Sequence, residues 1–121
     1  MNEVEKMATE MSEKKKRPLR CIARDHEWLM PCYRFSDNGF KRQIGKICEE
    51  VAEADEAYER FCAFGDHESR LNLLVECADI QHTVETLMHL LGTTAKERTM
   101  ARRLVWEKNN NRGYYKKKRK E

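Results

Sequence analysis

Apolar residues recur at helical intervals through the middle of the chain. Between residues 40 and 64 the steps alternate between three and four, at Ile44, Ile47, Val51, Ala54, Tyr58 and Phe61. Because an α-helix has about 3.6 residues per turn, this spacing places the side chains on one stripe. Gly65 is a suitable helix stop, and Asp66 is a suitable cap for a following helix. The pattern predicts an amphipathic helix over 40–64 that turns back at Gly65 and Asp66.

The next segment, from about residue 67 to 91, predicts a helix that is apolar on two sides. One side carries Leu71, Leu74, Val75 and Ala78, and another carries Ile80, Leu87, Leu90 and Leu91. A helix that is apolar on two sides needs packing partners on both. We therefore expect this helix to be central in a bundle and to contact another subunit.

Local signals define the remaining elements. Thr94 and Glu97 have the spacing of a capping box, which predicts a basic last helix running to about Asn110. The stretch 19–40 is expected to form a short helix and then a loop, because Pro31 interrupts it. The expected fold is all-α, an antiparallel helical bundle of about four helices whose core is completed by oligomerisation.

Composition is consistent with one small domain. The 121 residues are 40% hydrophobic and 37% charged, a balance that suits amphipathic helices around a small core. We expect a polar N-terminal arm over 1–17, an all-α domain over 18–113 and a basic tail over 114–121. The net charge of +3 arises from Lys-rich runs near the ends. Such runs are typical of solvated tails, so nucleic acid is not an expected partner.

Cysteine usage and hydropathy bear on the compartment. The five Cys are an odd number without C-x-x-C spacing, which argues against a disulfide framework or a zinc site. The sequence contains no apolar run of membrane-spanning length and no signal-peptide pattern. We expect a soluble, cytoplasmic protein with no membrane partner.

Two acidic patterns flank the predicted turn at nearly equal distances. They are Glu49-Glu50-x-x-Glu53 and Glu76-x-x-Asp79. In an antiparallel pair of helices, Glu53 comes level with Glu76, and Glu50 with Asp79. Either pattern alone is typical of a solvated helix face, but four converging carboxylates repel one another unless a cation lies between them. The expected ligands are Glu50, Glu53, Glu76 and Asp79, and oxygen ligands alone favour Mg²⁺ or Mn²⁺.

Basic residues near the end of the last helix suggest phosphate binding. Lys108 and Arg112 are four apart, on one face if the helix extends so far, and Arg112 can hold two phosphate oxygens at once. Asn109 adds neutral donors and an acceptor. Lys46, four residues before Glu50, could hold a phosphate or a carboxylate. The alternative for these cations is a solvated helix end that complements the helix dipole.

Together the acidic patterns and Lys108-Asn109-x-x-Arg112-x-Tyr114 resemble MazG-like proteins of the all-α nucleoside triphosphate pyrophosphohydrolase superfamily, over residues 40 to 115. The resemblance implies that the four carboxylates bind Mg²⁺ and that Lys108 and Arg112 bind phosphates. It also implies hydrolysis of a nucleoside triphosphate between its α and β phosphates, which releases a nucleoside monophosphate and pyrophosphate. The Lys-rich tail after Gly113 departs from many relatives, which makes a contribution from the tail doubtful.

A mechanism follows from these assignments. The metal would bridge phosphate oxygens and activate a water for in-line attack, while Lys108 and Arg112 offset the growing charge. Glu49 is a candidate general base, although the helical wheel turns it away from the metal. Trp28 and Tyr114 are candidates for substrate contact, and the other aromatic candidates for stacking on the base are Tyr33, Phe35 and Trp106. Ordinary packing is the competing explanation for each ring.

Two alternatives stay open. Asp79-x-x-His82 is half of a di-iron bundle motif, but such a bundle requires Glu-x-x-His on two helices. His26, His67 and His89 are expected to have no partner. The other alternative is a non-catalytic nucleotide-binding or interaction protein with the same fold. The sequence leaves open the base, the sugar and the choice between a homodimer and a homotetramer.

Overall fold

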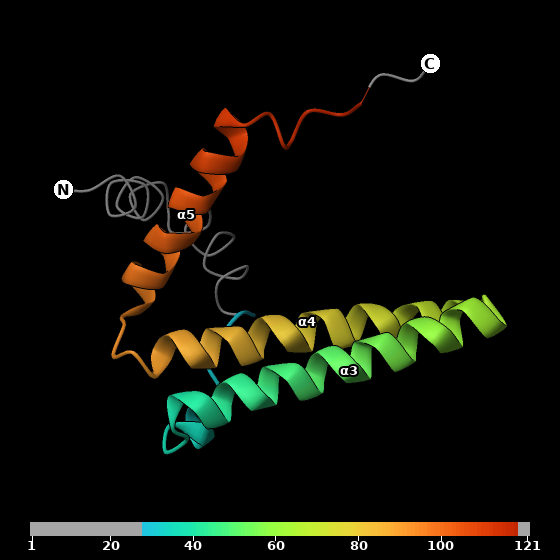
Figure 1. The fold of residues 1–121 in the computed structure, drawn as a ribbon, viewed down its shortest axis with the longest axis horizontal. Helices are drawn as coiled ribbons and strands as arrows, with labels where there is room; N and C mark the ends of the chain where they lie inside the picture. The colour runs from blue at the N-terminus through green and yellow to red at the C-terminus, as the bar shows by residue number, and fades with distance from the viewer. Residues whose placement is uncertain (1–27, 119–121) are drawn as a thin grey trace, which may run out of the picture.

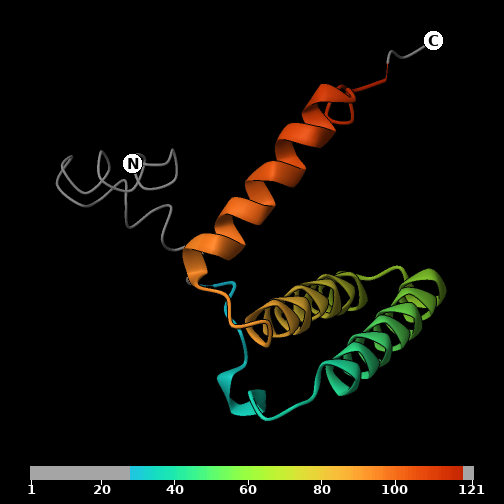
Figure 2. The same cartoon turned by 60° about the vertical axis from the view of Figure 1, so that its left-hand side comes forward.

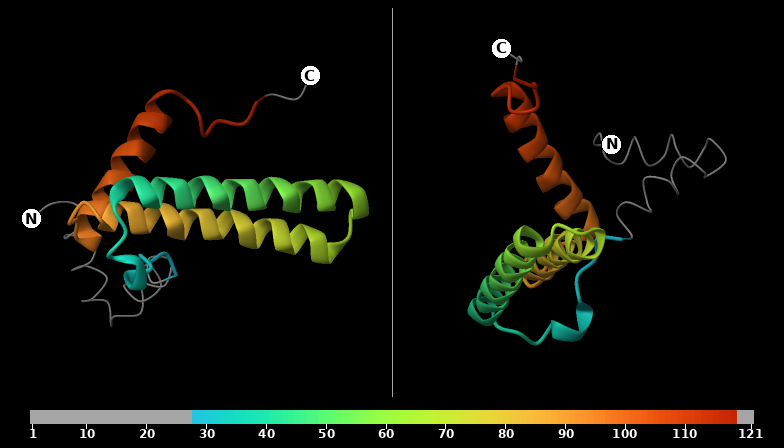
Figure 3. Two further views of the ribbon diagram at one scale, coloured as in Figure 1. Left: turned by 60° about the horizontal axis from the view of Figure 1, so that its bottom comes forward. Right: turned by 90° about the vertical axis from the view of Figure 1, so that its right-hand side faces the viewer.

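The computed structural model describes residues 28–118, in which every regular element is helical. A 3-10 turn, η1 (Tyr33–Phe35), precedes α3 (Phe40–Phe64), α4 (His67–His89) and α5 (Ala95–Asn111). Helices α3 and α4 lie side by side as an antiparallel hairpin, and α5 leaves its open end at a steep angle (Figure 1; Figure 2; Figure 3). The expected arm over 1–17, residues 18–27 and the last three residues lie outside the described part of the chain.

The helix caps predicted from the sequence are present in the structure. Gly65 ends α3 with φ of 60°, a left-handed conformation that glycine adopts without strain. Asp66 caps α4 by accepting a 2.8 Å hydrogen bond from the Ser69 amide. At α5, Thr94 and Glu97 form both bonds of a capping box. Helix α4 ends at His89, slightly earlier than expected, and none of the described helices combines the length and hydrophobicity required to cross a membrane.

The segment before α3 is held to α4 by polar contacts. The Cys32 backbone amide donates to Thr86 Oγ1 at 2.8 Å, and within the first turn of α3 the side-chain Nε2 of Gln43 donates to the Thr83 carbonyl at 3.1 Å. The expectation that His89 has no partner is wrong, because its ring makes an edge contact with Tyr33 at 5.0 Å between centroids. Within residues 28–39 the structure has the 3-10 turn η1 and no α-helix.

Little apolar surface is buried within the described part of one chain. Of the buried residues on the three described helices, only Ala57 is apolar. The predicted apolar stripes are close to half exposed, with values of 50% for Val51, 52% for Leu74 and 57% for Val75. The described part of a single chain therefore lacks the packed core that normally stabilises a helical domain.

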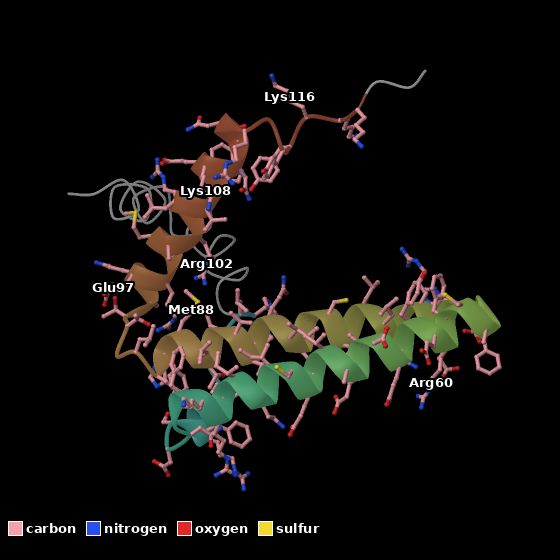
Figure 4. The ribbon with its side chains drawn as sticks, viewed as in Figure 1. Arg60, Met88, Glu97, Arg102, Lys108 and Lys116 are labelled. Atoms are coloured by element: carbon pink, nitrogen blue, oxygen red, sulfur yellow. The ribbon has the colours of Figure 1, made fainter. Side chains whose placement is uncertain are left out.

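A buried cluster of ions fixes the corner between α4 and α5. Glu85 accepts hydrogen bonds from Arg98 Nε at 2.8 Å and from Arg102 Nη1 at 2.7 Å. The side chains of Glu85 and Arg98 are only 4% and 5% exposed, and Arg98 also donates to the Thr93 carbonyl. Figure 4 shows Arg102 reaching from α5 towards α4. One carboxylate thus holds two turns of α5 and sets its direction.

Replacing this carboxylate tests its importance. Glu85→Ala leaves the buried Arg98 guanidinium without its counter-ion, so the free energy of unfolding should fall by about 3 kcal/mol. The matched control is Glu107→Ala, which removes a 46% exposed partner of Arg103 and should cost about 0.5 kcal/mol or less. Urea denaturation measures both values. Equal losses in the two variants would contradict the assigned role.

Candidate metal centre

The hairpin brings three of the four predicted ligands together. Glu50 from α3 and Glu76 and Asp79 from α4 place carboxylate oxygens within 4.8 Å of one another. Glu76 and Asp79 are three residues apart and lie on one face of α4. The turn at Gly65 sets the register that places Glu50 opposite them. These three residues are called the carboxylate trio below.

Two buried oxygens of the trio lack hydrogen-bond partners within the described residues. They are Glu50 Oε2 and Glu76 Oε2. Glu50 is 7% exposed, and Lys46 Nζ lies 3.8 Å from its other oxygen, Oε1. Burying an unpaired carboxylate oxygen is costly, so an isolated trio of ionised acids is unfavourable. A cation between the carboxylates would remove this cost.

The pKa of Glu50 is also affected by its burial and by the carboxylates around it. Burial, followed by the adjacent Asp79 carboxyl and the charge of Glu53, raises the pKa of Glu50 from 4.5 to about 7, against a smaller opposing effect of Lys46. Without a cation, the trio therefore favours a proton on Glu50. A divalent cation would compete with that proton for the same oxygens.

Glu53 lies outside the trio, although it was predicted as the fourth ligand. Its side chain is exposed, and it lines a cavity of about 270 Å³ together with Glu76. The cavity begins beside the trio and extends towards the hairpin turn, where Arg60, Ser69 and Asn72 also line it. Its volume can accept part of a small polar ligand next to the carboxylates.

Arg60 and Asn72 line the cavity but were not among the predicted site residues. Arg60 follows Glu53 by seven residues, so a helical wheel places both on one face of α3, which was the available signal. Figure 4 shows Arg60 reaching out from α3 near the turn. Glu49 is exposed on α3 and does not belong to the trio, in line with the wheel. Arg60 is thus the cationic residue that lines the cavity.

Of the predicted phosphate-binding residues, Lys46 lies beside Glu50 on α3, whereas Lys108 and Arg112 lie at the end of α5, away from the hairpin. Lys108 is exposed in the last turn of α5, and Arg112 caps that helix. Because α5 leaves the hairpin, Lys108 lies well away from α3 and α4 of its own chain (Figure 4). Asn109 donates to Tyr115 Oη at 3.3 Å, while the Arg112 guanidinium lies 5.8 Å from the centroid of the Tyr114 ring.

Trp28 and His82, which were considered for substrate contact and for a di-iron site, are not part of the trio. Trp28 is 77% exposed in the segment that leads to η1. His82, the imidazole of the di-iron alternative, lies with Nδ1 at 3.1 Å from the Met30 carbonyl oxygen and is not one of the clustered ligands. The described residues therefore offer a cluster of oxygen ligands without imidazole.

Comparison with protein-family models, with curated proteins and with solved structures finds no significant match. The case for this site depends on its own geometry, in which a buried, unpartnered Glu50 oxygen lies beside two further carboxylates.

Removing one charge from the trio tests whether it is a metal site or an ordinary solvated acidic face. The pKa of Glu50 in the folded state lies above its value in the unfolded state. The free energy of unfolding of metal-free protein should therefore fall as the pH rises from about 4.5 to 7, and it should stay lower above pH 7. Glu50→Gln should therefore raise the melting temperature of metal-free protein at pH 8. Mg²⁺ should raise the melting temperature of the wild type but not of this variant.

The matched control is Glu59→Gln, which removes an exposed acid from the same helix. It should keep the response of the wild type to Mg²⁺. Differential scanning calorimetry with and without Mg²⁺ measures these shifts. An unchanged melting temperature of the wild type in Mg²⁺, or an equal gain in Glu50→Gln, would contradict metal binding by the trio.

Proposed function

We propose that this chain is a Mg²⁺-dependent nucleotide pyrophosphohydrolase of the MazG-like type, which cleaves a (d)NTP to the (d)NMP and pyrophosphate. The observation that carries the proposal is the buried, unpartnered oxygen of Glu50 beside Glu76 and Asp79. The sequence pattern that links these acids to Lys108 and Arg112 supports the same activity.

The donor set fits Mg²⁺, with Mn²⁺ as a possible substitute. Glu50, Glu76 and Asp79 would hold the ion, and all of them offer hard oxygen ligands. Glu53, which is exposed on α3, would approach the ion from the solvent side. Mg²⁺ bound there would supply Lewis-acid stabilisation of the charge on the phosphate oxygens.

The residues of the cavity would position the substrate. The cavity next to the trio would accept the part of the nucleotide that adjoins the phosphates, with Asn72 offering both a donor and an acceptor. Arg60 would offset negative charge at the edge of the cavity. Glu53 lines the cavity, whereas Glu49 does not, so Glu53 is the better placed of the two to accept a proton from an attacking water.

A second copy of the chain would complete the site and the fold. Two hairpins packed through the exposed stripes of α3 and α4 would form a four-helix bundle and bury side chains such as Val51 and Leu74. In this arrangement Lys108 and Arg112 of one copy would approach the carboxylates of the other. A homodimer or a homotetramer satisfies this requirement. The competing function is a non-catalytic nucleotide-binding protein with the same fold.

Pyrophosphate release decides between these functions. Purified protein with Mg²⁺ and a panel of NTPs and dNTPs should release pyrophosphate, as measured by a coupled pyrophosphate assay. Glu53→Gln and Asp79→Asn should each lower the rate at least about a hundredfold while the chain remains folded by circular dichroism. The control Glu59→Gln should retain the activity of the wild type. Nucleotide binding without pyrophosphate release would favour the non-catalytic alternative, and full activity in both variants would exclude the metal assignment.

Mixing two inactive chains tests whether the site is shared. Asp79→Asn removes a carboxylate, and Arg112→Ala removes a predicted phosphate contact, so each variant alone should be nearly inactive. If the two halves come from different copies, mixed oligomers contain some intact sites and recover part of the activity. Activity is measured after unfolding and refolding the variants together, with each refolded alone as the control. The presence of mixed oligomers is checked by mass spectrometry. If mixed oligomers form and no activity returns, each site belongs to one chain.

A further inference from the structure

The tail after α5 folds back on the helix instead of continuing away from it. Gly113 has φ of 74°, which reverses the chain, and the Tyr114 amide then donates to the Asn109 carbonyl at 2.9 Å. The Lys116 amide donates to the Gly113 carbonyl at 3.2 Å. The expected tail over 114–121 therefore begins with a structured part, residues 114–116, next to the last turns of α5.

This return places two aromatic rings against each other. The rings of Trp106 and Tyr115 are stacked with 5.9 Å between centroids and an interplanar angle of 18°. Asn109 Nδ2 donates to Tyr115 Oη at 3.3 Å, which fixes the second ring to the helix. Trp106 is still 53% exposed and Tyr115 51% exposed. The stacked pair therefore presents aromatic surface to solvent in a defined orientation.

The chain that follows Glu107 is basic up to residue 118. Between residues 108 and 118 the chain carries Lys108, Arg112 and Lys116 to Lys118, and no Asp or Glu. The preceding acid, Glu107, is paired with Arg103 at 3.1 Å. Figure 4 shows Lys108 and Lys116 at this end of α5, well away from the hairpin. We call Trp106, Tyr115 and Lys116 to Lys118 the α5 platform.

We propose that the α5 platform binds single-stranded nucleic acid. A base would stack on the Trp106 and Tyr115 pair, and Lys116 to Lys118 would contact the phosphates on either side. A duplex keeps its base faces covered, so it offers no partner for the exposed rings. The run of amides at Asn109 to Asn111 is polar, which suits a nucleic acid better than the apolar layer of a membrane. The proposal goes beyond the pyrophosphohydrolase and does not depend on it.

Fluorescence gives a direct test, because the chain has only two Trp. In the full chain carrying Trp28→Phe, single-stranded oligothymidylate should quench the emission of Trp106. Anisotropy of a labelled oligothymidylate should give an affinity that falls about tenfold in Trp106→Leu and in Tyr115→Leu. The double variant Lys117→Gln/Lys118→Gln should reduce the slope of log affinity against log salt by about 1.4.

The matched control is Lys41→Gln/Arg42→Gln, which removes two exposed cations at the start of α3 and should leave affinity and salt slope close to those of the wild type. Equal binding of duplex and single strand, or unchanged affinity in both aromatic variants, would overturn the proposal. The same holds for tighter binding to anionic lipid vesicles than to the oligonucleotide. A change of oligomeric state in Trp106→Leu, measured by sedimentation, would assign the rings to a subunit interface instead.

Discussion

The antiparallel pairing of α3 and α4 is the constraint on which the rest of the structure depends. Glu50 precedes Gly65 by 15 residues and Asp79 follows it by 14, so equal rise along the two helices brings them level. The left-handed Gly65 and the Asp66 cap make the turn short enough to hold this register. Without the turn, the carboxylates would be separate, solvated acids on two helices.

The same pairing leaves an imbalance between polar and apolar burial. The contact between the helices buries Gln43, Glu50 and Thr83, while Val51 and Leu74 remain about half exposed. Burial of polar groups contributes little net stability even when they are bonded, and apolar burial is the main favourable contribution to folding. The exposed stripes of α3 and α4 are the apolar surface that the proposed second copy would cover.

Acidic residues predominate in the hairpin, and basic residues predominate at the end of α5. Glu85 holds Arg98 and Arg102 at the corner, so α5 has a defined direction that carries its cations away from the trio. Each charged region is consequently available to a ligand of opposite charge, a divalent cation at the hairpin and a polyanion at the end of α5.

Local rules in the sequence determined the helices and most of their ends. The apolar period of α3, the Gly65 stop, the Asp66 cap and the box at Thr94 and Glu97 act over a few residues, so they can be deduced without a structure. The proximity of Glu50, Glu76 and Asp79 also follows from the symmetry of the two acidic patterns about the turn. The exposed position of Glu49 follows from the helical wheel.

Tertiary structure alone decided the direction of α5, the exposed position of Glu53 and the partners of His89. The direction of α5 and the partners of His89 depend on contacts between residues far apart in sequence, such as Arg102 with Glu85 or His89 with Tyr33. No local period encodes such contacts, because the same charged residues are equally compatible with a solvated helix face. The return of the tail onto Trp106 required the three-dimensional position of Tyr115, which the sequence shows only as one of two adjacent tyrosines.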